Sequence, residues 1–212
     1  TITVIPQYCE DFYAQDIADA ELKSRFAGSF NILFAGNISP AQDLQNLARA
    51  MAQLKQQGVE NIRCLIVGDG MSREELEAFI EQQGVADRFV FCGQQPAADI
   101  PRWTGMADAL FAGLSASENL GLTVPAKITS YFAAGRPLLV AADGEAGRVA
   151  GESGAALVSP AGDAQALAAN ICTLAGLPTA ERAAMGEKGR QCYRTHYRRD
   201  LLLAKLRDFI LM

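Results

Sequence analysis

Apolar and polar positions alternate in two different rhythms along most of the chain. Short, nearly continuous apolar runs recur, and longer segments between them carry apolar residues at helical spacing, as at Leu44, Leu47, Met51 and Leu54. The first pattern predicts strands that are buried on both faces, and the second predicts amphipathic helices. The predicted strands cover residues 30–36, 62–68, 88–93, 107–112, 138–141 and 155–158.

Strands that are apolar on both faces and alternate with helices indicate a parallel sheet covered on both sides. We therefore expect a doubly wound, six-stranded α/β domain of the Rossmann-like type over residues 30–197, with helices in its C-terminal part. Residues 1–29 are expected to be an interdomain linker or N-terminal extension. Residues 198–212 are expected to form a leucine-rich helix that packs toward an upstream domain missing from this chain.

The segment 123–142 reads as a loop, a helix, a tight turn and a buried strand. Pro125 is predicted in the first helical turn and Gly135 at the left-handed end of the helix. Lys127 falls near the unpaired N–H groups of the helix start, where an anion is favoured. Two interpretations of Lys127 stay open, a phosphate contact and a solvated surface lysine. Elsewhere, Ser72 and Glu75 have the spacing of a capping box, and Asp163 is predicted to cap a helix that runs to about Ala175.

Glycine and polar residues follow several of the predicted strands. In doubly wound sheets, ligands bind beyond the carboxyl ends of the strands, where glycine lets a ligand approach the backbone. The sequence therefore predicts a ligand site at this edge, with Glu118 in a polar loop just before the helix of Lys127. The strand-end residues are Gly36, Asn37, Gly68, Asp69, Gly70, Gly93 and Gln94.

Composition narrows the function further. The formal net charge of −5 argues against sequence-independent binding of nucleic acid, which needs a basic surface. Five scattered cysteines and one histidine indicate neither a zinc site nor a disulfide framework, and a reducing cytosol is the simplest location. No apolar run approaches the length of a membrane span, so any membrane association is expected to be peripheral.

The chain lacks the sequence motifs of several kinds of active site. The chain has neither G-x-G-x-x-G nor G-x-x-x-x-G-K-[ST], and His196 lies far from the strand ends, which disfavours a Ser-His-Asp arrangement. Asp108 opens a strand and is interpreted as structural. The other charged candidates are Asp69, Glu118, Lys127, Arg136 and Arg148.

A series of short motifs in order carries a family resemblance. They are Phe-Ala-Gly-Asn at 34–37, Leu-Ile-Val-Gly-Asp-Gly at 65–70, Arg-Phe-Val-Phe-Cys-Gly at 88–93, Ile-Pro-Arg-Trp at 100–103, and Pro-Ala-Lys to Ala-Ala-Gly-Arg-Pro at 125–137. Together they resemble the C-terminal, donor-binding half of GT-B glycosyltransferases of family 4 (group 1), from residue 30 to about 199. The Pro-x-Lys variant is similar to bacterial transferases that build lipopolysaccharide O-antigen and capsule.

The resemblance implies roles for individual positions. Gly36 and Asn37 would face the donor phosphates and Lys127 the diphosphate. The sugar would lie at Glu118, Asn119, Leu120 and Gly121, and the nucleotide base and ribose at Gly68, Gly93, Gln94 and Ser130. Two positions depart from the pattern: residues 37–43 bring no positive charge, and Ser130 stands where the family's E-x7-E motif has its second Glu.

The resemblance also implies a chemistry: retaining, metal-independent transfer of a sugar from a nucleoside diphosphate, without a cofactor. The implied partners are a nucleotide-sugar donor, an acceptor glycan or lipid-linked glycan, and the missing N-terminal domain. The implied location is the cytoplasm, and peripheral association with the inner face of the cell membrane stays open. This chain alone is expected to bind a nucleoside diphosphate weakly and to transfer no sugar. A GT-B-type sugar-nucleotide epimerase and a non-catalytic binding or assembly module stay open as alternatives.

Overall fold

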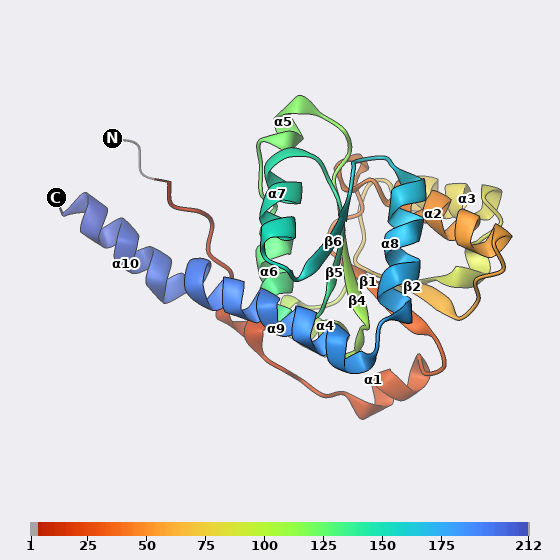
Figure 1. Cartoon of the computed structure of the whole chain (residues 1–212), viewed down its shortest axis with the longest axis horizontal. Coiled ribbons are helices and arrows are strands. Elements are labelled where there is room, and N and C mark those ends of the chain that lie inside the picture. The colour runs from red at the N-terminus through yellow and green to blue at the C-terminus, as the bar shows by residue number, and fades with distance from the viewer. Residues whose placement is uncertain (1–3, 212) are drawn as a thin grey trace.

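The six predicted strands form one parallel sheet. The structure is a computed structural model that describes residues 4–211, so residues 1–3 of the predicted linker and residue 212 of the predicted terminal helix lie outside it. The strand order is β3-β2-β1-β4-β5-β6, which is the doubly wound order, and the fold prediction is confirmed (Figure 1). The strands are β1 (Phe30–Ala35), β2 (Ile62–Val67), β3 (Phe89–Gly93), β4 (Ala109–Gly113), β5 (Leu138–Ala141) and β6 (Ala156–Ser159).

Helices cover both faces of the sheet (Figure 1). One face packs against α2 (Leu44–Gln56), α3 (Arg73–Gln82) and α8 (Ala164–Gly176). The other packs against α4 (Ile100–Met106), α6 (Ala126–Ala134), α7 (Gly144–Glu152) and α9 (Thr179–His196). The remaining helices are α1 (Ala20–Arg25), α5 (Glu118–Gly121) and α10 (Arg199–Ile210), with short 3-10 turns at η1 (Asp11–Ala14), η2 (Pro40–Gln42), η3 (Ala86–Arg88) and η4 (Ala97–Asp99).

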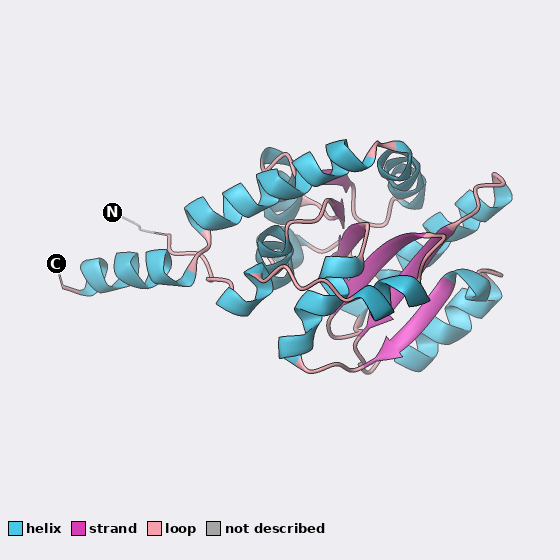
Figure 2. Ribbon diagram, turned by 90° about the horizontal axis from the view of Figure 1, so that it is seen from below, coloured by secondary structure: helices cyan, strands magenta, loops and turns pink. Residues whose placement is uncertain are grey.

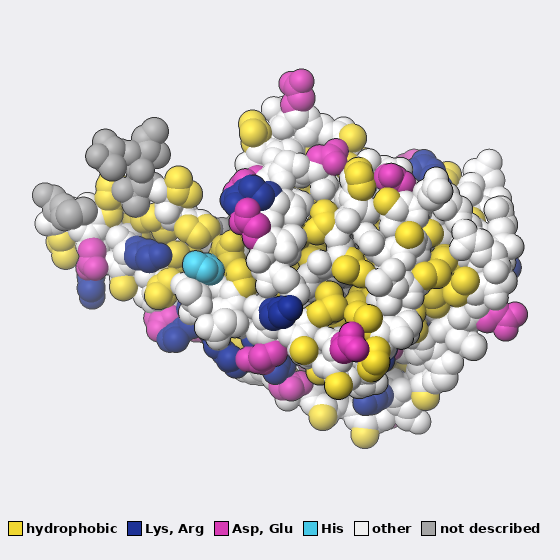
Figure 3. Space-filling model, in the orientation of Figure 1, with side chains coloured by type: hydrophobic (Ala, Val, Ile, Leu, Met, Phe, Trp, Pro, Cys, Tyr) yellow, Lys and Arg dark blue, Asp and Glu magenta, His cyan; other side chains and the backbone are white. Residues whose placement is uncertain are grey.

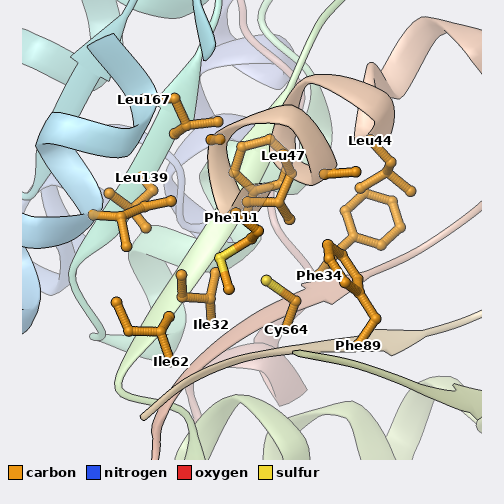
Figure 4. Packing of buried hydrophobic residues seen from close by; sticks show 14 of the residues in the cluster. Ile32, Phe34, Leu44, Leu47, Ile62, Cys64, Phe89, Phe111, Leu139 and Leu167 are labelled. Carbon is orange, nitrogen blue, oxygen red and sulfur yellow. The ribbon is translucent and has the colours of Figure 1, made fainter. Parts of the chain in front are cut away.

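The core under α2 and α8 accounts for the apolar residues on one face of these strands. Ile32, Phe34 and Phe111 point from the sheet toward Leu47 of α2, and all four side chains are fully buried (Figure 4). Cys64 lies in the same layer, where burial raises the pKa of its thiol, as expected for a core cysteine. Loss of any large side chain here leaves a cavity, which costs about 2–5 kcal/mol in cores of this kind.

Local predictions at helix ends are partly confirmed. Gly135 ends α6 with φ of 67°, and the Asp163 carboxylate accepts a hydrogen bond from the Ala166 N–H at 2.9 Å. Pro125 is the residue before α6, with an extended ψ of 139°, so its predicted place within the first turn is wrong. The helix α7 between β5 and β6 was not predicted, because its glycine and alanine positions give a weak apolar pattern.

The capping box at Ser72 is also wrong. The Ser72 side chain makes no capping hydrogen bond, since its ψ of 14° is not the extended conformation that a capping serine adopts. Its backbone N–H donates instead to the carbonyl of Ile38 at 3.2 Å. The Glu75 carboxylate accepts a hydrogen bond from Gln45 Nε2 at 3.0 Å and so links α3 to α2.

The first and last described residues lie at the same end of the molecule, where α10 projects from the body (Figures 1 and 2). Only Leu202 of α10 is buried, and hydrophobic side chains gather on the surface around this helix (Figure 3). The exposed large apolar residues of this segment are Leu203, Leu206, Phe209, Ile210 and Leu211. Over residues 4–211, no helix has the length and apolar character to cross a membrane.

Candidate donor-binding site

A cavity of about 780 Å³ lies beyond the carboxyl ends of β1, β2 and β3, next to the start of α6. This volume lies within the range of small-molecule sites. Six of the residues to which the family resemblance gives a role line it, namely Gly36, Asn37, Gly68, Gln94, Lys127 and Ser130. The other lining residues are Tyr13, Ala35, Val67, Asp69, Gly70, Gln95, Pro96, Ala97, Ile100, Ala126 and Tyr131.

Backbone pairing continues past the strands and shapes the floor of the cavity. The Gly36 N–H donates to Val67 O at 2.9 Å, and the Gly68 N–H donates to the carbonyl of the predicted base contact Gly93 at 2.8 Å. Gly68 has φ of +138°, and a Cβ on it would lie 1.9 Å from the Gly36 carbonyl oxygen. The loops after β1 and β2 can therefore meet only because position 68 is glycine.

The side chain of Lys127 places a buried amino group at the wall of the cavity. Its Nζ atom is buried and has no hydrogen-bond partner within residues 4–211. It lies 3.3 Å from the centroid of the Phe34 ring, a cation–π contact. Burial lowers the pKa of Lys127 well below its ordinary value. The alternative of a solvated surface lysine is thus wrong, and a ligand that offers negative charge would supply the missing partner.

Asp69 is a carboxylate in the same lining, but its charge has a partner. One oxygen accepts a hydrogen bond from the Gly70 N–H at 2.8 Å, and the other lies 3.6 Å from Nη1 of Arg73. Among the described lining residues, Lys127 is the one Lys or Arg side chain. The cavity therefore presents a single cation without an anionic partner beside the first N–H groups of α6.

Tyr131 ties α6 to the end of β1. The backbone N–H of Ala35 donates to the Tyr131 hydroxyl oxygen at 2.9 Å, and burial raises the pKa of this phenol. The bond positions Lys127, which lies one turn earlier on the same helix. Sequence reasoning assigned Tyr131 only to the apolar face of its helix, because a partner on a strand almost a hundred residues away has no local pattern.

Ser130 lies on the same turn of α6 and contacts the N-terminal segment. Its hydroxyl donates to the Ala126 carbonyl at 3.0 Å, and the Cys9 thiol donates to the Ser130 oxygen at 3.8 Å. Burial raises the pKa of Cys9 to about 11. Residues before β1 thus reach the cavity wall, which the sequence did not reveal.

The predicted sugar-binding residues lie elsewhere. Glu118, Asn119, Leu120 and Gly121 form α5, which packs against α7 and does not belong to the lining of the cavity. The Gly121 carbonyl lies against Gly144 at the start of α7, within 2.1 Å of where a Cβ of Gly144 would be. Their predicted role at the sugar stays a prediction.

The other charged candidates are structural or exposed. Asp108 accepts a hydrogen bond from the Asn31 N–H at 2.9 Å, which agrees with a structural role. Arg148 pairs with Glu145 and Glu152 on the surface of α7, and His196 is exposed at the end of α9. Arg136 donates to the carbonyl of Gly105 and lines a separate, smaller cavity.

Comparison with known proteins identifies the family of the chain. The family model described as "Glycosyl transferases group 1" matches residues 29–176. The chain belongs to this family. A 2-deoxystreptamine glucosyltransferase of Streptomyces kanamyceticus is 35% identical to this group 1 chain over 127 residues, covering 57% of the chain and 32% of that relative.

Two further similarities extend along nearly the whole chain. A GDP-mannose-dependent alpha-(1-6)-phosphatidylinositol monomannoside mannosyltransferase of Mycobacterium tuberculosis is 27% identical over 205 residues, covering 94% of the chain and 52% of that relative. The structure of Anabaena Alr3699/HepE in complex with UDP and glucose superimposes with a TM-score of 0.80 at 20% identity, covering 95% of the chain and 55% of HepE. The group 1 chain thus spans between a third and about half of the length of these proteins.

Proposed function

We propose that this chain is the donor-binding half of a glycosyltransferase that moves a sugar from a nucleoside-diphosphate sugar to a polysaccharide or lipid-linked acceptor. The observation that carries the proposal is the buried Lys127 ammonium, which has no hydrogen-bond partner in the described chain and lies beside glycine-lined strand ends. Family membership supports the diphosphate of a sugar donor as the anion that pairs with Lys127. The HepE structure, which contains UDP and glucose, supports the same class of ligand.

The diphosphate would lie between the loops after β1 and β2 and the start of α6. The backbone amides near Gly36 and Asn37 and the first N–H groups of α6 would contact its oxygens, and Lys127 would pair with its charge. Transfer breaks the bond between the sugar C1 and the diphosphate oxygen and forms a bond from C1 to the oxygen of an acceptor hydroxyl, whose proton is released with the nucleoside diphosphate. Fixed dipoles and a cation stabilise the departing diphosphate. We propose that Lys127 and these amides do so without a metal or cofactor, with retention at C1.

The nucleoside and the sugar would extend in opposite directions from the diphosphate. Gly68, Gly93, Gln94 and Ser130 would border the base and ribose. The segment of α5, from Glu118 to Gly121, would meet the sugar only if the loop that carries it moved toward the cavity, because it packs against α7 in the free chain.

The rest of the enzyme would supply the acceptor site. The chain covers about half of its longer relatives, so we propose an N-terminal domain that closes over the cavity and packs against the exposed apolar residues of α10. The mycobacterial relative is named for a phosphatidylinositol acceptor, which supports a lipid-linked acceptor. We propose synthesis of a bacterial surface glycan such as lipopolysaccharide, at the cytoplasmic face of the cell membrane.

Calorimetric titration of UDP, GDP and their sugars into the chain tests this proposal. We expect weak binding of one nucleotide and its sugar, and sugar transfer only when the N-terminal half is present. Conversion of the donor to another sugar nucleotide would favour the epimerase, and binding without transfer by the longer protein would favour a non-catalytic module. Failure to bind any nucleoside diphosphate would contradict the proposed function.

A further inference from the structure

One wall of the cavity comes from outside the predicted Rossmann-like domain. Tyr13 belongs to η1, in the segment that precedes β1, and its side chain lines the cavity together with residues of α4 and α6. The turn η1 packs against both of these helices, and the half-buried Tyr13 packs against the core of the same face. A segment far from the strand ends in sequence is therefore built into the site.

The N-terminal segment contacts α6 one turn beyond Lys127. Lys127 lies in the first turn of α6, and Ser130 follows it by one turn, which is about 5 Å along the helix axis. Cys9 contacts Ser130, so the segment that carries Tyr13 crosses α6 at the second turn. Tyr13 thus belongs to a segment that crosses α6 one turn beyond Lys127, and it lines the same cavity.

The lining around Tyr13 differs in chemistry from the lining around Lys127. Pro96, Ala97 and Ile100 contribute apolar surface from the loop after β3 and the start of α4. A cavity with a cation and amides at one end and an aromatic ring with apolar neighbours at the other fits a ligand that joins an anion to a flat, weakly polar group. A nucleoside diphosphate has this composition.

The Tyr13 hydroxyl is available for a ligand. Within residues 4–211 it makes no hydrogen bond to the protein, whereas the Ser130 hydroxyl already donates to Ala126 O. Burial, with Cys9 and Glu10 nearby, raises the pKa of Tyr13, so the phenol is neutral near pH 7 and both donates and accepts hydrogen bonds.

We propose that Tyr13 contacts the nucleoside of the donor, with its ring against the nucleoside and its hydroxyl hydrogen-bonded to it. This inference rests on the proposed function. It means that the segment before β1 completes the donor site. This segment lies beside Ser130, the position at which the family motif has a glutamate. Tyr13 is then a residue for nucleotide affinity and selectivity, distinct from the phosphate contacts.

Three ligands and two substitutions test the inference. UDP, GDP and inorganic pyrophosphate are titrated into the wild-type chain and into Tyr13→Ala and Tyr13→Phe. Tyr13→Ala removes the ring on which a base would stack, so its nucleotide affinity should fall about tenfold to a hundredfold. Tyr13→Phe keeps the ring, so a loss of about threefold to tenfold is expected from the missing hydrogen bond. Pyrophosphate affinity should not change in either variant.

Tyr8→Ala is the matched control, because Tyr8 is a half-buried tyrosine of the same segment that packs beside Arg199 and does not line the cavity. Its nucleotide affinity should equal that of the wild type. Unchanged nucleotide affinity in Tyr13→Ala, or an equal loss for pyrophosphate, would overturn the inference. If wild type binds neither UDP nor GDP, the proposed function fails, and this inference fails with it. Melting temperatures of all variants separate loss of folding from loss of binding.

Discussion

The two ends of the cavity are built by different means. At the end that holds Lys127, the loops after β1 and β2 pair through backbone hydrogen bonds and meet at glycines. At the end that holds Tyr13, side chains from the loop after β3, from α4 and from the N-terminal segment pack together. The first end is formed by the backbone. Its shape should change little when side chains are replaced, except where a side chain is added at a glycine. The second should respond to single side chains.

The largest expected effect is on the backbone-built end. Gly68→Ala places a Cβ 1.9 Å from Gly36 O at a positive φ, so the free energy of unfolding should fall by roughly 2–4 kcal/mol. Urea denaturation measures this loss. Gly176→Ala is the control, because nothing lies within 4 Å of its Cβ and its φ is ordinary, and it should be neutral or slightly stabilising. Equal stability of the two variants would contradict a glycine requirement at position 68.

The next effect concerns the cation. Lys127→Ala should weaken binding of UDP or GDP by roughly 1.5–3 kcal/mol, or about tenfold to a hundredfold, because a charge-assisted bond to the diphosphate is lost. Lys127→Met, which keeps the apolar stem, should lose as much. Loss of the charge should not lower the melting temperature of either variant, because the described chain buries this ammonium without a hydrogen-bond partner. Lys205→Ala, at an exposed lysine of α10, should leave affinity unchanged. Unaltered affinity in Lys127→Ala would remove this residue from the site.

A third effect is the pH dependence of binding. Burial lowers the pKa of Lys127 in the free chain, and a bound diphosphate would raise it again by favouring the charged form. Affinity should therefore decrease as pH rises through the lowered pKa, with uptake of a proton on binding in that window. Titrations in buffers of different ionisation enthalpy measure the uptake, and Lys127→Met should abolish it.

The same group has the opposite effect on stability. The unfolded chain keeps Lys127 protonated to about pH 10.4, so between the lowered pKa and that value the folded chain binds fewer protons than the unfolded chain. The destabilisation from this lysine is complete below its folded-state pKa and disappears as pH rises toward the unfolded value. The stability difference between Lys127→Met and wild type should shrink over this window. A difference that is independent of pH would contradict the burial of the ammonium.

The smallest expected effect is at α5. Glu118→Gln should leave the affinity for UDP or GDP within about 0.5 kcal/mol, because Glu118 is exposed and does not line the cavity. A nucleotide sugar should bind about threefold to tenfold more weakly if this carboxylate accepts a hydrogen bond from the sugar. An equal loss for the nucleotide and its sugar would show that the α5 segment lies at the diphosphate instead.

Much of the fold could be predicted because its pattern is local. The six strands were placed within two residues, since a strand buried on both faces must be apolar at nearly every position, and Gly135 and Asp163 end and begin helices by their own conformational preferences. The capping box at Ser72 failed because Ser72 has a ψ of 14° instead of the extended conformation, and its backbone N–H donates to the distant Ile38 carbonyl. The same competition between local and distant partners limits every motif of a few residues.

The sequence by itself determined the doubly wound sheet and the edge at which the cavity lies, because hydrophobic period, glycine and chain order act over short distances. It named Lys127 as a candidate at this edge but left a surface lysine open. Only the tertiary structure decided that the Lys127 ammonium lies buried against Phe34, that Tyr131 bonds to the end of β1, and that Tyr13 reaches the cavity. These contacts join segments separated by about a hundred residues. Their energies depend on how helices and loops pack around the sheet, which no local pattern encodes.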